Sequence, residues 1–419
     1  MQAIAINGQR LLDDLAALAQ IGAEPSGGVT RPAYSLKEKA AHAWFKKQAK
    51  EAGLTVSTDA FGNILALEKD AGDGPPVLSG SHLDTVPNGG RFDGALGVAS
   101  ALEAVRAIRR QVKTRRRRPL GVLVLAAEES SRFGSACLGS RALIGDLKPR
   151  DLQTLRDANG VTLYQAMQQI GLLPEQLASV KRRAGWFYEF VELHIDQSDD
   201  LFKAKSPVGV ITAIAAPTRL RIVLNGQQAH SGATLMNRRR DALTGAAEVI
   251  LAVEAAARAR IEREIVGTVG VIKVEPGSMN VIPGRVELGV DIRGVDAATV
   301  HAVVQQVTQK AQQTAHKRGL TASVSVTSSV KPLPIAPERV TALENACQAA
   351  GINSVQLVSR SAHDALYLGR RGPVSMLFVR NPAGISHNPA EAARDEDVVS
   401  GALVLATCLA RNVTRSSVQ

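Results

Sequence analysis

One run of sequence constrains the fold more than any other: an apolar strand at 77–80 that leads through a loop into a helix at about 94–110. The loop has the sequence Gly80-Ser-His-Leu-Asp-Thr-Val-Pro-Asn-Gly-Gly-Arg-Phe-Asp-Gly94. Other strand-like runs surround helical segments, at 54–57, 63–67, 122–127 and 190–195. This alternation predicts an α/β fold, in which a catalytic domain has a central, mostly parallel sheet flanked by helices.

A second pattern begins after Pro217. It runs strand, helix, strand, strand, helix, strand, at 220–224, 240–260, 265–274, 285–291, 297–318 and 322–326. This βαββαβ order is typical of a ferredoxin-like, two-layer domain. The 419 residues are enough for two domains. We therefore predict a catalytic domain in two parts, 1–216 and 332–419, interrupted by an inserted domain at 217–331.

Composition excludes several classes of protein. Hydrophobic residues make up 45% and charged residues 21%, which argues against disorder. Aromatic residues are only 3%, too few for a surface that stacks nucleic-acid bases, so we expect no nucleic-acid partner. No apolar stretch approaches the roughly 20 residues of a membrane span, so we expect no membrane association. Residues 1–20 lack the pattern of a secretory signal, which favours a cytoplasmic location.

Charge and cysteine content add two expectations. The net charge of +11 favours anionic partners. The densest basic run, Arg115 to Arg118, joins a helix to a strand and is expected to be a solvated connection, with a polyanion site as the alternative. Cys137, Cys347 and Cys408 are far apart and odd in number, which fits three ordinary thiols rather than a disulfide framework or a cysteine-rich zinc site.

The loop after the strand at 77–80 carries the first candidate ligands. His82 offers an imidazole and Asp93 a carboxylate, at the strand end where open α/β sheets bind ligands. Asp84 lies two residues after His82 and so shares its strand face. Metal-bound imidazoles usually donate their second N–H to such a partner, so Asp84 is predicted to orient His82. The alternative is an ordinary glycine-rich turn with a capping aspartate.

Three further clusters follow apolar strands. Glu128 and Glu129 are adjacent, so their side chains diverge, and one can bind a metal while the other acts as general base. His194 and His387 each lie at or after a strand, where a single histidine is more often a satisfied polar residue. Together with His82 and Asp93 they make a nitrogen and oxygen set suited to zinc, manganese, cobalt or nickel. Five ligands exceed one tetrahedral site, so two metal ions sharing a carboxylate are the simplest arrangement.

These residues lie in a series of motifs that resembles a known family. The motifs are G-S-H-L-D-T-V-P-N-G-G-x-F-D-G, E-E-x-S-R-F-G, E-L-H-I-x-Q, A-H-x-G followed by R-R-D-A-L, N-V-I-P-G with D-x-R, and S-H-N-P. The chain resembles the N-carbamoyl-L-amino acid hydrolase and allantoate amidohydrolase branch of the aminoacylase and carboxypeptidase-like metallohydrolases. The resemblance extends over about residues 80–391. It implies a catalytic α/β domain with an inserted lid that mediates dimerisation.

The resemblance also implies roles for single residues in the metal centre. Asp93 would bridge two metal ions, with His82 and His194 on one ion and Glu129 and His387 on the other. Glu128 would be the general base.

Further residues would contact the substrate. By the same resemblance His230 would stabilise the oxyanion, Asn280 and Arg293 would bind the substrate carboxylate, and Gln197 would face the substrate. Some of these residues come from the partner subunit in the family, which implies a homodimer. Arg293 also suits this role chemically because a guanidinium binds a carboxylate with two parallel hydrogen bonds, although a surface ion pair is the alternative.

Some positions stay open. His363 and Asp364 are predicted to border the pocket, with a helix cap as the alternative for Asp364. The chain departs from the family at Asp196 and Ser198, beside His194, and at Ser231 and Leu235, beside His230. These departures leave the substrate less defined than the reaction class.

Three functions follow from these observations. The first is metal-dependent hydrolysis of the ureido C–N bond of an N-carbamoyl-L-amino acid or a related ureido acid such as allantoate. The second uses the same dinuclear site to cleave an N-acyl amino acid or a dipeptide. The third, a basic binding protein without catalysis, is supported by net charge alone.

Overall fold

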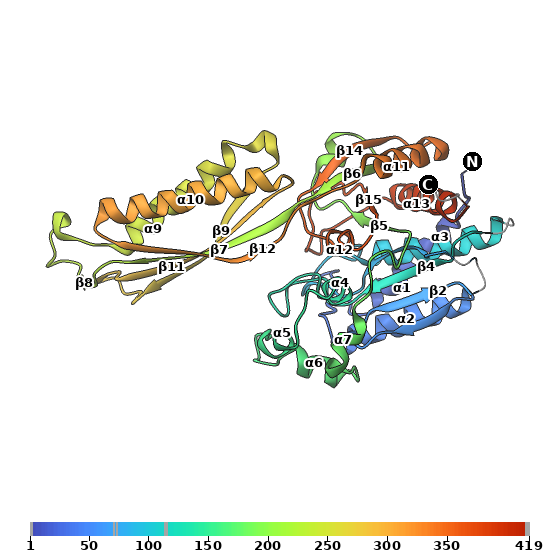
Figure 1. The fold of residues 1–419 in the computed structure, drawn as a ribbon, viewed down its shortest axis with the longest axis horizontal. Coiled ribbons are helices and arrows are strands. Elements are labelled where there is room, and N and C mark those ends of the chain that lie inside the picture. The colour runs from blue at the N-terminus through green and yellow to red at the C-terminus, as the bar shows by residue number, and fades with distance from the viewer. Residues whose placement is uncertain (1–2, 70–71, 73, 113–115, 415–419) are drawn as a thin grey trace. The chain divides into compact units, whose positions relative to one another are not determined.

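The computed structural model describes residues 3–69, 72, 74–112 and 116–414, which form two compact units. The first comprises Met1–Thr212, Ile335–Leu357 and His363–Gln419. The second comprises Ala213–Pro334 and Val358–Ala362. The chain thus leaves the first unit, builds the second, and returns (Figure 1).

A nine-stranded sheet is the centre of the first unit. Its order is β1-β2-β4-β3-β5-β15-β6-β13, with β14 also paired to β6. The strands are β1 (Thr55–Thr58), β2 (Ile64–Leu67), β3 (Val77–His82), β4 (Leu120–Leu125), β5 (Glu189–Ile195), β6 (Val208–Ile214), β13 (Leu333–Pro334), β14 (Ser354–Ser359) and β15 (Val374–Val379). Strands β4, β3, β5 and β15 run parallel, whereas β1 with β2, β2 with β4, β15 with β6 and β6 with β13 are antiparallel pairs. The α/β class is confirmed, and the sheet is mixed, with parallel pairing among its four central strands.

Helices cover both faces of this sheet. Successive residues of a strand face opposite sides. On β5, the Leu193 side chain lies against Gly401 of one helix, while the Glu192 carboxylate accepts a hydrogen bond from the Ala365 N–H of another. The sheet therefore lies between α13 and α12. The helices of this unit are α1 (Gly8–Gln20), α2 (Leu36–Glu51), α3 (Ala95–Gln111), α4 (Leu138–Ile144), α5 (Pro149–Thr154), α6 (Leu163–Gln169), α7 (Leu177–Val180), α8 (Asp200–Lys203), α11 (Pro337–Ala350), α12 (Asp364–Leu368) and α13 (Asp395–Thr414).

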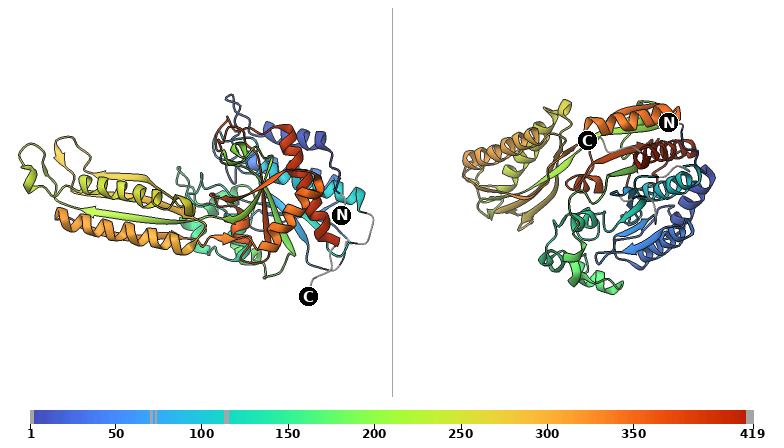
Figure 2. Two further views of the ribbon diagram at one scale, coloured as in Figure 1. Left: turned by 90° about the horizontal axis from the view of Figure 1, so that it is seen from above. Right: turned by 45° about the vertical axis from the view of Figure 1, so that its right-hand side comes forward.

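The second unit is a two-layer domain with its own core. Its main elements are β7 (Ala216–Asn225), α9 (Ala242–Arg258), β9 (Val266–Glu275), β11 (Arg285–Gly294), α10 (Ala297–Arg318) and β12 (Thr321–Ser329). The four strands form an antiparallel sheet in the order β12-β7-β11-β9. Helices α9 and α10 lie together on one face of it, and buried aliphatic side chains fill the space between the layers (Figures 1 and 2). The element order is the predicted βαββαβ pattern, whereas a role as lid or dimerisation domain stays a prediction.

Two expectations from composition need correction. Helix α13 is long and apolar enough to cross a membrane by length and composition alone, so the expectation that no stretch approaches that length was wrong. Most of α13 is buried within the protein, where it packs on α3 and α11, as a core helix does.

The basic run is also less solvated than expected. Arg116 forms an ion pair with Glu68 at 2.9 Å, and the buried Arg118 lies over the Tyr188 ring and donates to the Asn412 carbonyl. Arg115, the first residue of the run, lies outside the described residues. Within the described part, Arg116 and Arg118 make internal contacts.

Candidate metal centre

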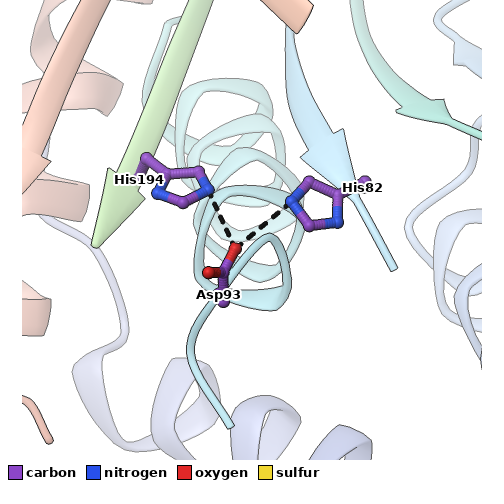
Figure 3. A group of neighbouring side chains, drawn as sticks. All are labelled: His82, Asp93 and His194. Atoms are coloured by element: carbon purple, nitrogen blue, oxygen red, sulfur yellow. Dashed lines mark ion pairs between the residues drawn. The ribbon is translucent and has the colours of Figure 1, made fainter. Parts of the chain in front are cut away.

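Two parallel neighbouring strands place the first pair of ligands. His82 is the last residue of β3, and His194 is the last but one of β5. Ser79 pairs with Val191, so the same register brings His82 level with His194. Their ring centroids are 5.9 Å apart, and both side chains are buried. The carboxyl ends of the parallel strands thus supply two imidazoles side by side (Figure 3).

The loop between β3 and α3 carries Asp93 to these rings. Oδ1 of Asp93 lies 3.3 Å from Nε2 of His82 and 3.2 Å from Nε2 of His194 (Figure 3). Gly94 follows with a positive φ of 65°, and a Cβ there would lie 2.5 Å from the His82 ring. Only glycine allows this turn and this close approach.

The second oxygen of Asp93 faces a second group of ligands. Nε2 of His387 lies 3.4 Å from Oδ2 of Asp93 and 3.3 Å from Oε1 of Glu129. The candidate ligands therefore form two groups of three that share Asp93. One group contains His82 and His194, and the other contains Glu129 and His387. All five predicted metal ligands lie together in the first unit.

The donor chemistry fits divalent metal ions. Nδ1–H of His82 donates to the Asp84 carbonyl and Nδ1–H of His194 to the Ile195 carbonyl, both at 3.0 Å. These bonds leave Nε2 of each ring to face Asp93 with its lone pair. Nε2 of His82 is buried and has no hydrogen-bond partner among the described residues. An ion between these atoms would satisfy it.

Electrostatics also favour a cation here. Burial raises the pKa of Glu129 well above its ordinary value, and the nearby Asp93 and Glu128 carboxylates add to the effect. Burial alone would also raise the pKa of Asp93, but the adjacent His194 and His82 outweigh it and lower that pKa well below its usual range. Buried carboxylates so close together repel one another, and bound divalent ions would relieve that repulsion.

Asp84 orients the site differently from the prediction. Its backbone carbonyl, rather than its carboxylate, accepts the hydrogen bond from His82, and Oδ1 lies 3.5 Å from Nδ1. The carboxylate instead accepts the backbone N–H groups of Glu128 and Glu129 at 3.1 and 3.0 Å. Asp84 thus ties the strand end that carries His82 to the start of the loop that carries the two glutamates.

Glu128 lies beside the ligands without belonging to either group of three. Its Oε2 is 3.9 Å from Nε2 of His82, and Cys137 Sγ lies 3.2 Å from Oε1 as a hydrogen-bond donor. Its exposed fraction is 8%, and burial raises its pKa to about 7. A carboxylate with this pKa can exchange a proton near neutral pH.

Other predicted residues of the first unit lie around the ligands. Gln197 Nε2 donates to Oδ2 of Asp93 at 3.1 Å, so in this structure it contacts a candidate ligand. The buried His363 ring lies 4.5 Å from that of His194. Asp364 begins α12 without capping it and accepts a hydrogen bond from Ser140 Oγ. The unusual Asp196 holds its own turn, because its carboxylate accepts N–H groups of Ser198 and Leu201.

Sequence reasoning missed two residues of this site. Ser386 Oγ donates to Oδ2 of Asp93 at 3.0 Å and lies 3.2 Å from Oε2 of Glu391. Glu391 is buried, and its Oε1 accepts the backbone N–H groups of Phe92 and Asp93. The only signal in the sequence is an acidic residue four positions after the candidate ligand His387.

His230, Asn280 and Arg293 belong to the second unit. His230, on β8 (Ala229–His230), pairs with β10 (Val281–Ile282), and Ser231 N–H donates to the Asn280 carbonyl. Nδ1 of His230 accepts the N–H groups of Gly232 and Ala233, which leaves Nε2–H of the neutral ring as a donor. Arg293 donates Nε–H to Oδ1 of Asp291 at 2.8 Å.

His230 and Arg293 lie far apart within this unit. The two-stranded β8–β10 sheet adjoins the Arg285 end of β11, where Gly226 N–H donates to the Gly284 carbonyl. Arg293 is near the opposite end, eight residues along the strand, which corresponds to about 27 Å. The structure therefore brings His230 and Asn280 together but not His230 and Arg293.

Known proteins are similar to this chain in sequence and in fold. Residues 78–411 match the family model of Peptidase family M20/M25/M40. An N-carbamoyl-L-amino acid amidohydrolase from Geobacillus stearothermophilus is 39% identical over 402 residues, which cover 96% of this chain and 97% of that protein. A ureidoglycolate hydrolase from Oryza sativa subsp. japonica is 36% identical over 409 residues, 96% of this chain and 84% of that protein.

A solved structure is also similar to this chain. The crystal structure of an amidase of the hydantoinase/carbamoylase family from Burkholderia multivorans matches with a TM-score of 0.86 and 35% identity, over 98% of this chain and 99% of that chain. The resemblance inferred from the motifs is confirmed.

Replacing Asp84 with Asn tests the link between His82 and the glutamates. An amide has one oxygen acceptor, so it cannot accept both backbone N–H groups as the carboxylate does. We expect Asp84→Asn to weaken metal binding by about 10- to 100-fold, as loss of residues that support metal ligands typically does. Competition with a chromophoric chelator measures this affinity. The exposed Asp13→Asn is the control, and an Asp84→Asn variant that matches it would contradict the role.

Proposed function

Since the chain belongs to Peptidase family M20/M25/M40, we propose that it hydrolyses the ureido C–N bond of an N-carbamoyl-L-amino acid or a related ureido acid. The chain is an enzyme that hydrolyses C–N bonds, and the names of its relatives support a ureido-acid amidohydrolase. The observation that carries metal-dependent hydrolysis is the position of Asp93 between two groups of ligands, with the buried Glu128 beside them, and the names of the relatives favour the ureido bond.

Enzymes of this family are metal-dependent, and we propose two divalent ions per subunit. His82, Asp93 and His194 would hold one ion, and Asp93, Glu129 and His387 the other. Zinc, manganese, cobalt and nickel all suit this mixture of nitrogen and oxygen ligands. When bound, such ions polarise the ureido carbonyl and lower the pKa of water.

Glu128 is proposed to move the proton. Its carboxylate accepts a proton from the water that attacks the ureido carbon, and then delivers it to the departing nitrogen as ammonia leaves. The other product is a carbamate, which releases carbon dioxide to leave the free amino acid. The Cys137 thiol and the buried surroundings hold the carboxylate in place for both transfers.

The second unit is proposed to supply groups that recognise the substrate. Nε2–H of His230 suits an oxyanion, and the Arg293 guanidinium suits a carboxylate once it is freed from Asp291. Asn280 and Gln197 complete the proposed set. Because about 27 Å of strand separates His230 from Arg293, one small substrate cannot contact both in the same subunit. We therefore propose a homodimer, in which one of the two comes from the partner.

Two other functions are less well supported than ureido hydrolysis. Cleavage of an N-acyl amino acid or a dipeptide would use the same ligands, and product analysis separates it from ureido hydrolysis. The complete set of candidate ligands, four of them buried, argues against a basic binding protein without catalysis. A cytoplasmic location and the absence of nucleic-acid and membrane partners stay predictions.

Ammonia release from a panel of substrates tests the reaction. The panel contains N-carbamoyl-L-amino acids, ureidopropionate, ureidoglycolate and allantoate, with added zinc or manganese. We expect ammonia from at least one ureido acid, and we expect a chelator to abolish its release. A metal-loaded protein that leaves every ureido acid intact but cleaves N-acyl amino acids or dipeptides would contradict the ureido proposal.

The adjacent residues Glu128 and Glu129 allow a matched test of Glu128 as the general base. Glu128→Gln should keep both metal ions and lose about 10²- to 10⁴-fold in kcat, because it removes only the proton acceptor. Glu129→Gln should instead lose metal from the group that contains His387. Metal content and kcat measured on both variants separate the two roles. Near wild-type turnover by Glu128→Gln would remove Glu128 from the mechanism.

Mixing two inactive variants tests the homodimer. His230→Ala and Arg293→Ala should each be inactive alone. If the two residues come from different subunits, dissociation and reassociation of the mixture should restore about a quarter of wild-type activity, because half of the dimers then hold one intact site of two. A mixture that stays inactive after verified subunit exchange would contradict a site shared between subunits.

A further inference from the structure

We propose that Glu391 is a positioning residue that fixes Asp93 against the His387 loop and thereby controls the metal ion held by Asp93, Glu129 and His387. The inference rests on the proposed two-metal site. It concerns only groups within the first unit.

The contacts of Glu391 join two loops that are far apart in sequence. Oε1 accepts the N–H of Phe92 at 2.9 Å and that of Asp93 at 3.1 Å. Ser386 Oγ lies between two carboxylates, 3.2 Å from Oε2 of Glu391 and 3.0 Å from Oδ2 of Asp93, to which it donates. One carboxylate thus holds the backbone of the shared ligand and lies against Ser386, whose hydroxyl contacts that ligand's side chain.

Burial of the Glu391 carboxylate is energetically unfavourable unless other groups compensate its charge. Glu391 is 4% exposed and forms no ion pair with Lys or Arg among the described residues. A buried carboxylate is unfavourable unless polar groups compensate it, and here the backbone N–H groups of Phe92 and Asp93 do so. Removing the carboxylate would leave two buried backbone N–H groups without an acceptor.

The backbone opposite Glu391 leaves room for its carboxylate. Gly90 lies against it, and a Cβ at that position would be 2.0 Å from Oε1 of Glu391. A side chain at position 90 would therefore displace the carboxylate from the Phe92 and Asp93 N–H groups. The loop and the acid fit one another only with glycine at position 90.

The two metal groups depend on this contact unequally. His82 and His194 are held by adjacent sheet strands. His387 instead lies on a loop, with a left-handed φ of 56° and a side chain that is 50% exposed. Ser386 contacts Oδ2 of Asp93, the oxygen that faces His387, whereas Oδ1 faces the strand histidines. Loss of Glu391 should therefore disturb the His387 group first.

Zinc titration of the metal-free protein against a competing chelator tests the proposal. Wild type should bind two ions. Glu391→Ala should lower the affinity for the ion held by Asp93, Glu129 and His387, called the second ion, by about 10- to 100-fold. The affinity for the first ion, held by His82, Asp93 and His194, should stay within about threefold of wild type. Glu391→Gln should retain most of the affinity, because its amide oxygen can still accept both N–H groups. The exposed Glu396→Ala is the matched control and should bind like wild type.

Several results would overturn the proposal. Wild-type affinity for both ions in Glu391→Ala would do so, and so would an equal loss at both sites, which a general loss of fold would produce. If Glu391→Ala does not fold, Ser386→Ala removes only the hydroxyl that lies between Glu391 and Asp93. That variant should lower the affinity for the second ion alone, and an unchanged affinity for that ion would overturn the proposal.

Hydrogen exchange separates this inference from the proposed dinuclear site. A wild type that binds fewer than two ions would contradict the dinuclear site. The positioning role is then judged on the metal-free protein, where Phe92 and Asp93 amides should exchange faster in Glu391→Ala than in Glu396→Ala. Equal exchange rates in the two variants would refute the positioning role.

Discussion

The shared carboxylate of Asp93 is the interaction on which the site depends. Each of its oxygens faces different imidazoles, so its place sets the separation of the two candidate metal positions. Asp84, Glu128 and Glu129 bring three more buried carboxylates to the same region. Such a concentration of negative charge is unfavourable in a protein interior unless cations compensate it. The parallel centre of the sheet supplies the rigid part of this arrangement, and the loops that carry Asp93, Glu129 and His387 supply the rest.

The length of strand β11 in the second unit limits which residues can act on one substrate. Strand β11 runs from Arg285 to Gly294, with the β8–β10 sheet that carries His230 at one end and Arg293 near the other. A rigid antiparallel strand keeps these groups apart at a fixed spacing. If both act on one substrate, the spacing itself requires two copies of the chain. Oligomerisation would then be part of the chemistry, because no single copy could complete the site.

The sequence predicts residues whose role depends on where strands end. His82, Asp93, Glu129, His194 and His387 all follow or end apolar runs, and parallel strands bring such positions to one edge of a sheet. Glu391 and Ser386 could not be predicted in this way, because their contacts with the Asp93 loop arise only from tertiary structure. The same limit applies to Asp84, whose carboxylate binds the backbone of the loop after β4, and to the antiparallel pairing of β2 with β4. Apolar runs reveal strands, but they do not reveal strand direction.

The most direct test of the account is the anomalous diffraction of crystals grown with zinc or manganese. We expect two anomalous peaks per subunit that flank the Asp93 carboxylate. One peak should lie among Asp93, His82 and His194, and the other among Asp93, Glu129 and His387. A single peak, or peaks that do not share Asp93 as a ligand, would contradict the dinuclear centre and the mechanism built on it.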